Sequence, residues 1–162
     1  MVAFFEMIGG QALAFIGFAL AVGLCCIGSA KGTGMVGEAA TGVLSETPEH
    51  FTKCMILQAL PGTQGLYGLA AGFFGLFTLG FFSGSPATLS VADGFSVLMA
   101  CVPIMLGGLL SAIAQGRVAA ASINIVAKKP DDYMKGVIMC GIVEFYAILS
   151  LVGTILLLMN AL

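Results

Sequence analysis

Glu144 is the residue in this sequence with the clearest potential for chemistry, because it lies inside a long apolar run from 136 to 162. The other side chains of this run with appreciable polarity are Tyr146, Ser150, Thr154 and Asn160. A carboxylate without a partner costs about 2.5–3.5 kcal/mol at the centre of a bilayer, so such acids persist where they have a partner or a function. We therefore expect Glu144 to bind a cation and to help carry it across a membrane.

A second group of polar residues lies between residues 60 and 67. The residues at positions i, i+3, i+4 and i+7 of this segment are Leu60, Thr63, Gln64 and Tyr67. This spacing places them on one face of a helix. Pro61 removes the backbone N–H that would bond the carbonyl of Leu57, which loosens the turn beside the polar groups. Tyr67 has two interpretations: it packs in the core or at the membrane interface, or it donates its hydroxyl to Glu144.

Gln64, Gln115 and Glu144 are expected at one depth in the membrane. Gln64 lies 11 residues after Lys53, and Glu144 lies 9 residues after Lys135. Gln115 lies 13 residues before the lysine at position 128. With a helical rise of about 1.5 Å per residue, all three are then roughly 13–20 Å from the basic edge, near the middle of the membrane.

These groups offer several oxygen ligands to a hard cation, which prefers carboxylate, amide, hydroxyl and backbone carbonyl oxygens. The side-chain oxygens belong to Thr63, Gln64, Gln115 and Glu144. A backbone carbonyl near Pro61 would add another. A proton needs only the carboxylate and one hydrogen-bond partner, so the additional oxygens favour Na⁺, with H⁺ as the alternative. Taken singly, each amide or hydroxyl could instead hydrogen-bond between helices, as is common in membrane proteins.

The composition indicates a membrane protein and excludes several other classes. Hydrophobic residues make up 59% of the 162 residues and charged residues only 9%, against about 25% charged residues in soluble domains. The net charge of −2 is too small for a nucleic-acid partner. The five cysteines lie in or beside apolar segments without metal-binding spacing. Their odd number argues against a disulfide framework, so we interpret them as small packing residues.

The apolar stretches predict an all-α membrane protein with four transmembrane helices that form two tandem hairpins. The helices are expected at 8–44, 51–82, 92–127 and 133–160, each long enough to cross about 30 Å of hydrocarbon. The breaks between them contain proline and polar residues, which are typical of helix ends. Residues 1–82 form the first hairpin in this prediction, and residues 83–162 form the second.

The two hairpins are related as a duplication whose repeats have parallel orientation. An alignment without gaps places Pro48 on Pro130, Lys53 on Lys135 and Gly62 on Glu144. Upstream, Ser29 falls on Gln115 and Lys31 falls on Arg117. The distance from the upstream basic residue to the loop proline is 17 residues in the first repeat and 13 in the second. This difference is about one helical turn. The two hairpins therefore share one carboxylate.

The distribution of charge predicts the orientation of the chain in a cell membrane. All six basic residues lie near the first and third breaks, and the second break has none. By the positive-inside rule, loops 1–2 and 3–4 face the cytoplasm, whereas both termini and loop 2–3 face outside. Small residues recur on helices one and three at spacings typical of helix association. We expect copies to join head-to-tail into a ring, with helices one and three inside and helices two and four outside.

Several segments resemble the proteolipid subunit of V-type ATPases, and most closely the sodium-pumping K subunit of fermentative bacteria. These segments are GSAKG at 28–32, LQALPGTQGLYG at 57–68, IAQGRVA at 113–119, KKP at 128–130 and VEFYAIL at 143–149. The resemblance covers nearly the whole chain, and the segment at 57–68 is highly specific. It implies a ring of such subunits that rotates in the membrane, driven by ATP hydrolysis in a separate soluble sector.

The same resemblance implies a set of ligands and partners. Sodium would be held by five oxygen ligands. They are the backbone carbonyl of Leu60 and the side chains of Thr63, Gln64, Gln115 and Glu144. Tyr67 would bond the carboxylate. The partners implied are further copies of the chain, a stator membrane subunit whose positive charge favours ion release, a central-stalk subunit, and lipid.

The chain by itself is expected to be an ion-carrying subunit without catalytic activity of its own. It contains no phosphate-binding Gly-Lys-Ser/Thr loop and no nucleophile–base pair. An alternative from another class is a channel or a secondary transporter, which would work without an ATPase sector. A transporter would be expected to hold a substrate cavity within its own four helices.

Overall fold

The structure, a computed structural model, describes residues 2–161 and the side chains of residues 9–161, and it is almost entirely helical. The helices are α1 (Val2–Leu44), α2 (Phe51–Ala59), α3 (Thr63–Thr78), α4 (Val91–Ala100), α5 (Val102–Lys128) and α6 (Tyr133–Ala161). Short 3₁₀ turns are η1 (Pro48–His50), η2 (Leu60–Gly62), η3 (Phe81–Ser83) and η4 (Pro130–Asp132). The all-α fold class predicted from the sequence is confirmed.

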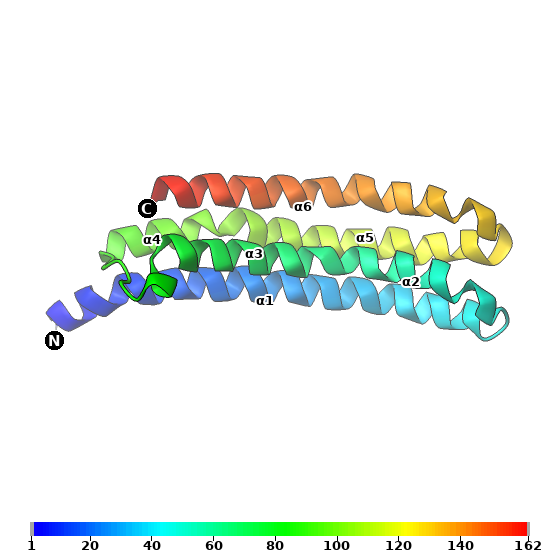
Figure 1. The fold of residues 1–162 in the computed structure, drawn as a ribbon, viewed down its shortest axis with the longest axis horizontal. Helices are drawn as coiled ribbons and strands as arrows, with labels where there is room; N and C mark the ends of the chain where they lie inside the picture. Colours follow the sequence, from blue (N-terminus) through cyan, green and yellow to red (C-terminus); the bar gives the residue numbers. More distant parts are fainter. Residues whose placement is uncertain (1, 162) are drawn as a thin grey trace.

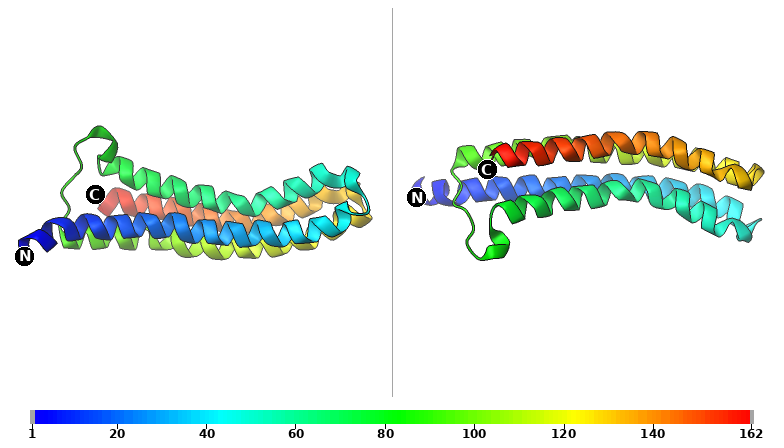
Figure 2. Two further views of the ribbon diagram at one scale, coloured as in Figure 1. Left: turned by 90° about the horizontal axis from the view of Figure 1, so that it is seen from below. Right: turned by 45° about the horizontal axis from the view of Figure 1, so that its top comes forward.

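These elements form four long segments that lie side by side in one slightly bowed bundle (Figures 1 and 2). The α1–α2 and α5–α6 turns lie at one end, and the α3–α4 connection lies at the other (Figure 1). α1 packs along α4 and α5, α3 packs mainly on α1, and α6 packs mainly on α5. α3 also contacts both α5 and α6. The two hairpins therefore start at the same end and run in the same direction.

Two of the predicted helices are divided where a proline interrupts the backbone. The segment expected at 51–82 changes to 3₁₀ geometry at Leu60–Gly62 and its last helix ends at Thr78. The segment expected at 92–127 is two helices, with Cys101 between them and Pro103 in the first turn of α5. Proline lacks the N–H that continues the ladder, which explains both breaks. The chain then leaves α3 through Gly80, with a φ of 74°, a conformation that favours glycine.

Three helical stretches of the described chain are long and apolar enough to cross a membrane, as judged by length and composition. They are Gly9–Leu44, Val91–Lys128 and Pro130–Ala161. The remaining segment is divided at η2 into helices of 9 and 16 residues and is not one of the three.

The contact between α1 and the α4–α5 segment depends on glycine. A Cβ added to Gly116 would overlap the backbone of Gly32, and one added to Gly28 would lie 2.7 Å from the carbonyl oxygen of Leu109. These distances leave no space for a side chain, so the two helices approach backbone to backbone. The close packing of small residues that we expected on helices one and three is present between α1 and α5.

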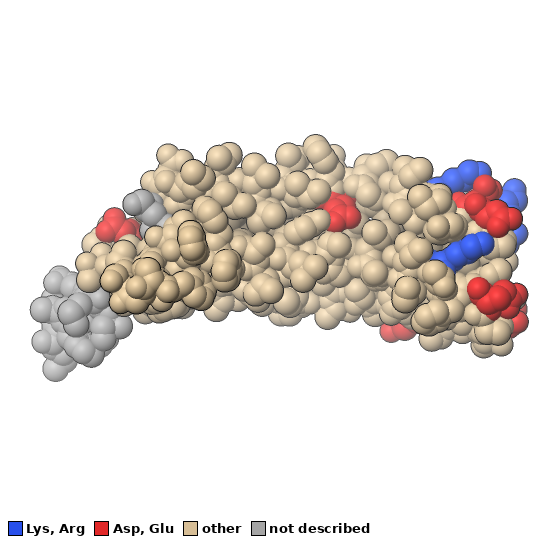
Figure 3. Space-filling model, viewed as in Figure 1, with Lys and Arg blue, Asp and Glu red and all other residues tan. Residues whose placement is uncertain are grey.

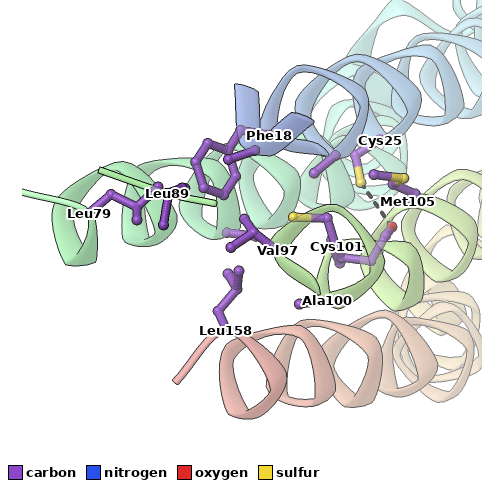
Figure 4. Packing of buried hydrophobic residues seen from close by; sticks show 13 residues of the cluster. Phe18, Cys25, Leu79, Leu89, Val97, Ala100, Cys101, Met105 and Leu158 are labelled. Atoms are coloured by element: carbon purple, nitrogen blue, oxygen red, sulfur yellow. Dashed lines mark hydrogen bonds between the residues drawn. The ribbon is translucent and has the colours of Figure 1, made fainter. Parts of the chain in front are cut away.

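Two apolar clusters fill the bundle on either side of its middle. One contains Phe18, Cys25, Leu79, Val97 and Leu158 among others (Figure 4). The other contains Val36, Cys54, Leu57, Ile123 and Cys140 among others. Along each helix, the polar residues singled out in the sequence lie between the segments that contribute to these clusters. Along the axis of the bundle, the polar groups therefore lie between two regions of apolar packing.

The break between α4 and α5 is secured by side chains from two neighbouring helices. The Ile104 N–H donates to Thr154 Oγ1 of α6 at 3.1 Å, and Cys25 Sγ of α1 donates to the Ile104 carbonyl oxygen at 3.2 Å (Figure 4 draws the second). Thr154 and Ile104 are fully buried. Because an unpaired polar group in a buried helix is costly, these bonds stabilise an interruption that proline would otherwise leave weak.

Candidate functional site

The structure brings all six site residues predicted from the sequence into one hydrogen-bonded network between α3, α5 and α6. The network residues are Leu60, Thr63, Gln64, Tyr67, Gln115 and Glu144. The first four come from η2 and the start of α3, Gln115 comes from α5, and Glu144 comes from α6. The site therefore needs residues from both hairpins.

Glu144 is held by a bond across the two hairpins. Tyr67 Oη donates to Glu144 Oε1 at 2.5 Å. Gln115 Nε2 approaches Glu144 Oε2 at 3.4 Å, so both carboxylate oxygens face donors. A hydrogen bond to an ionised carboxylate is shorter and stronger than one between neutral groups, and these two donors stabilise a carboxylate that apolar residues surround. Of the two interpretations of Tyr67, the structure supports the hydrogen bond.

Gln115 lies at the centre of the network. It is fully buried, as is Gln64, and its Oε1 accepts from Gln64 Nε2 at 2.7 Å. Its Nε2 donates to the backbone carbonyl of Cys140, one turn before Glu144, at 3.0 Å. Buried amides are tolerated when their donors and acceptors are paired, and no buried side-chain nitrogen or oxygen in the described residues lacks a hydrogen-bond partner.

The 3₁₀ turn supplies the remaining oxygens. The hydroxyl of Thr63 donates to the Leu60 carbonyl oxygen at 2.9 Å and lies 3.4 Å from Gln64 Oε1. Three oxygens, one each from a carbonyl, a hydroxyl and an amide, are thus gathered within one short stretch of chain. The Leu60 carbonyl also accepts the backbone N–H of Thr63, the bond that closes the 3₁₀ turn.

The site opens onto an apolar surface rather than into the bundle. Glu144 and Tyr67 are partly exposed, whereas Gln64 and Gln115 are buried behind them. On either side of Glu144, Ile142 and Phe145 are 60% and 57% exposed. Large apolar side chains with such exposure are typical of a face that meets lipid or another membrane helix. A cation bound here would lie at the edge of the bundle.

The charges of the molecule are concentrated elsewhere. On the face shown in Figure 3, Lys and Arg gather at the end with the α1–α2 and α5–α6 turns, and one acidic side chain stands alone about halfway along. At the charged end, Lys53 of α2 lies 3.4 Å from Asp131 of η4 and so links the two hairpins. Lys31 and Arg117, at equivalent repeat positions, line one groove together with Glu38.

Two contacts of the site were not assigned from the sequence. The Cys140 carbonyl accepts from Gln115, and the Ser29 hydroxyl of α1 accepts from the Gly65 N–H beside Gln64. The first follows from helical spacing, because residue i−4 lies below Glu144 on the same face. For the second, the repeat alignment places Ser29 on Gln115, a signal from which no role for Ser29 was inferred. Tyr146 lies in a groove between α5 and α6, away from the network.

Comparison with known proteins gives a consistent result. The profile of a family described as the C subunit of ATP synthase matches the chain twice, at residues 16–74 and 98–157. Each match lies within one hairpin, which confirms the duplication. The chain is 48% identical over 153 residues to the V-type sodium ATPase subunit K of Enterococcus hirae, covering 94% of each chain.

A second relative is more distant. The chain is 35% identical over 154 residues to the A-type ATP synthase subunit K of Methanocaldococcus jannaschii, covering 95% of this chain and 65% of that relative. Both relatives are therefore similar to this chain along nearly its whole length.

Proposed function

Because this chain belongs to the family of the ATP synthase C subunit, we propose that it is the ion-carrying membrane subunit of a V-type ATPase and that its cargo is Na⁺. ATP hydrolysis takes place in a separate soluble sector, to which this chain provides no catalytic group. The observation that carries the proposal is the single network of Leu60, Thr63, Gln64, Gln115 and Glu144 around one membrane-embedded carboxylate.

The proposed ligands are chemically suited to sodium. One carboxylate, two amides, a hydroxyl and a carbonyl are oxygen ligands of the kind that hard cations prefer. Rotation of a glutamine amide group by about 180° exchanges the positions of its oxygen and nitrogen. Rotation of the Gln64 and Gln115 amides together would keep the hydrogen bond between them and present the Gln115 oxygen to an ion, at the loss of the bond to the Cys140 carbonyl. The name of the relative that is 48% identical specifies sodium, which supports the same cargo here.

The carrying step follows from electrostatics. One carboxylate with one monovalent cation is neutral, so the loaded site can move past lipid, whereas an empty carboxylate cannot do so cheaply. Glu144 lies at an apolar edge of the bundle, where a loaded site would meet lipid during rotation. A positive charge on a stator membrane subunit would favour the empty carboxylate and so release the ion at one point of the cycle.

We further propose that all four segments span the membrane and that residues 1–82 and 83–162 are the two hairpins. The segment at 51–78 crosses despite its break, because Pro61 of η2 is buried against the protein and Ser29 accepts the backbone N–H of Gly65 just after the break. The α1–α2 and α5–α6 turns, near which the basic residues lie, face the cytoplasm, and the termini and the α3–α4 loop face outside. Met1 and Leu162 lie outside the described residues.

Copies of the chain assemble into a ring in this proposal. α1 and the α4–α5 segment form the inner circle, and α3 and α6 form the outer circle, which places Glu144 where it can meet the stator. Apolar grooves lie on two flanks of the bundle, one between α1 and α3 and one between α5 and α6. Because the flanks differ, copies join head-to-tail, and such contacts close into rings. A central-stalk subunit would bind the cytoplasmic turns.

A ring with one carboxylate per four helices carries fewer ions per turn than a ring with one carboxylate per hairpin. Each ion then receives a larger share of the energy of ATP hydrolysis, which suits a pump. Gly62 stands where the first repeat would need its acid, so this property follows from the chain itself.

The second candidate is the same rotor with H⁺ as its cargo. The short bond from Tyr67 to Glu144 favours it, because a proton carrier needs only the carboxyl group and one hydrogen-bond partner. Sodium is the better proposal because it accounts for the buried pair Gln64 and Gln115 as well.

The test is protection of Glu144 in purified rings from a hydrophobic carbodiimide at neutral pH. Carbodiimides react with the protonated carboxyl group, and bound Na⁺ displaces that proton. We expect Na⁺ to slow the modification in a saturable manner while K⁺ at the same concentration does not. Modification that depends on pH but is indifferent to Na⁺ would establish the proton carrier instead.

A further inference from the structure

We propose that Ser29 is a positioning residue for the ion site, which it serves by anchoring the first turn of α3 without contacting the ion. The inference rests on the proposed function of the site. Ser29 Oγ of α1 accepts a hydrogen bond from the Gly65 N–H at 2.9 Å. Ser29 is 7% exposed, so water does not compete for this bond.

The bond is made at the end of the segment that carries most of the proposed ligands. The Leu60 carbonyl, Thr63 and Gln64 all precede Gly65 directly. Their positions depend on the 3₁₀ turn, which lacks the regular ladder of an α-helix. A fixed point just after the ligands therefore limits how far this turn can shift.

α1 holds the other side of the turn as well. Pro61 is buried, and a Cβ built on Gly32 would lie 2.7 Å from Pro61 Cβ. Ser29 and Gly32 are one helical turn apart on α1 and so share a face. The ligand segment is thus clamped at residue 61 by packing and at residue 65 by a hydrogen bond.

The duplication gives Ser29 a counterpart. Ser29 aligns with Gln115, and each reaches from the first helix of its hairpin to the second. Gln115 of α5 reaches Glu144 and the Cys140 carbonyl of α6, whereas Ser29 of α1 reaches the α3 backbone. The first repeat has no carboxylate at the position equivalent to Glu144. Its polar residue, Ser29, instead holds the α3 backbone that carries ligands for the site of Glu144.

The experiment compares variants of the intact ring by the Na⁺ and Li⁺ concentrations that half-protect Glu144 from carbodiimide. We expect Ser29→Ala to require about 3- to 10-fold more Na⁺, in line with the loss of one hydrogen bond, and to change the Na⁺/Li⁺ ratio because the ligand spacing is less fixed. Ser29→Thr keeps the hydroxyl and should restore native values. Ser29→Cys keeps the volume with a poorer acceptor and should shift in the same direction as Ser29→Ala.

Ser122→Ala is the matched control. Ser122 is 6% exposed, and its hydroxyl donates to the Val118 carbonyl of its own helix at 2.8 Å, so the same chemical change is made without loosening α3. Its half-protection and its Na⁺/Li⁺ ratio should equal those of the native ring.

The outcomes separate the two proposals. If Na⁺ protects the native ring and the Ser29→Ala ring has the same half-protection concentration and Na⁺/Li⁺ ratio, the positioning role alone is overturned. Equal shifts in the Ser29→Ala and Ser122→Ala rings would overturn it as well. If Ser29→Ala does not assemble, native values in Ser29→Cys would overturn it. A native ring that Na⁺ does not protect would refute the sodium carrier and this inference with it.

Discussion

Tyr67 and Glu144 are separated by 77 positions in the chain, yet the phenol of one donates to the carboxylate of the other at 2.5 Å. The phenol belongs to the first hairpin and the acid to the second. The carboxylate of Glu144, in the second repeat, is therefore stabilised by the first repeat, which has no carboxylate at the equivalent position. Neither hairpin alone would contain the complete site.

Replacement of this phenol tests the relationship directly. We expect Tyr67→Phe to weaken Na⁺ binding by about 0.5–1.5 kcal/mol, the typical worth of one hydrogen bond, with the ring still assembled. The measurement is the Na⁺ concentration for half-protection from carbodiimide. Tyr146→Phe is the control because Tyr146 is 64% exposed and lines a separate groove, and an equal effect of both changes would contradict the role of Tyr67.

Replacement of the acid should separate assembly from transport. Glu144→Gln keeps the size of the side chain and removes the intramembrane negative charge, so we expect a folded, assembled ring in which coupled transport is abolished. The measurement is ²²Na⁺ uptake by vesicles that contain the reconstituted complex, alongside the oligomeric state of the ring. Full sodium transport by this variant would refute the assignment of Glu144.

The two polar ligands on α3 and α5 should contribute unequally. We expect Gln115→Ala and Thr63→Ala each to weaken Na⁺ binding by roughly 1–3 kcal/mol, because each leaves one polar requirement of the bound ion unmet. Gln115→Ala should have the larger effect, since it also removes the partner of Gln64 and of the Cys140 carbonyl. Unchanged radiolabelled sodium binding in both variants would mean that these oxygens are structural, and a proton cargo would then be favoured.

The occupancy of the site should depend on pH through competition between H⁺ and Na⁺ at one carboxylate. A proton removes the charge that binds Na⁺, so lower pH must raise the Na⁺ concentration needed for half-protection. Where the empty site is mostly protonated, the rise approaches about tenfold per pH unit. The check is a series of Na⁺ titrations across pH, and a half-protection concentration independent of pH throughout would argue against a shared site.

The proposed assembly predicts one closed oligomer. The two flanks of the bundle carry different apolar grooves, so copies should join head-to-tail and close into a ring rather than pair about a two-fold axis. Native mass spectrometry or projection images in mild detergent would measure the copy number. A monomer or a two-fold dimer as the only species would contradict the rotor.

The fold was largely accessible from the sequence, and the exceptions have identifiable causes. The apolar stretches and their proline-containing breaks indicated the helices and the duplication. The division at Cys101 was not expected, because Pro103 is followed by an uninterrupted apolar run that is typical of a continuous helix. Thr154 and Cys25 secure this break from other helices, and such contacts leave no local pattern.

By itself, the sequence determined that one acid lies in an apolar helix, that Thr63, Gln64 and Tyr67 share a helix face, and that the hairpins are duplicated. These properties depend on residue type and on the helical period, which are local. Only the tertiary structure decided that Gln115 bonds both Gln64 and Glu144, that the phenol of Tyr67 spans the hairpins, and that Ser29 holds Gly65. Those contacts depend on how each helix is rotated about its axis, and this rotation is constrained by close glycine contacts of α1 with α5 and α3, and of α5 with α6.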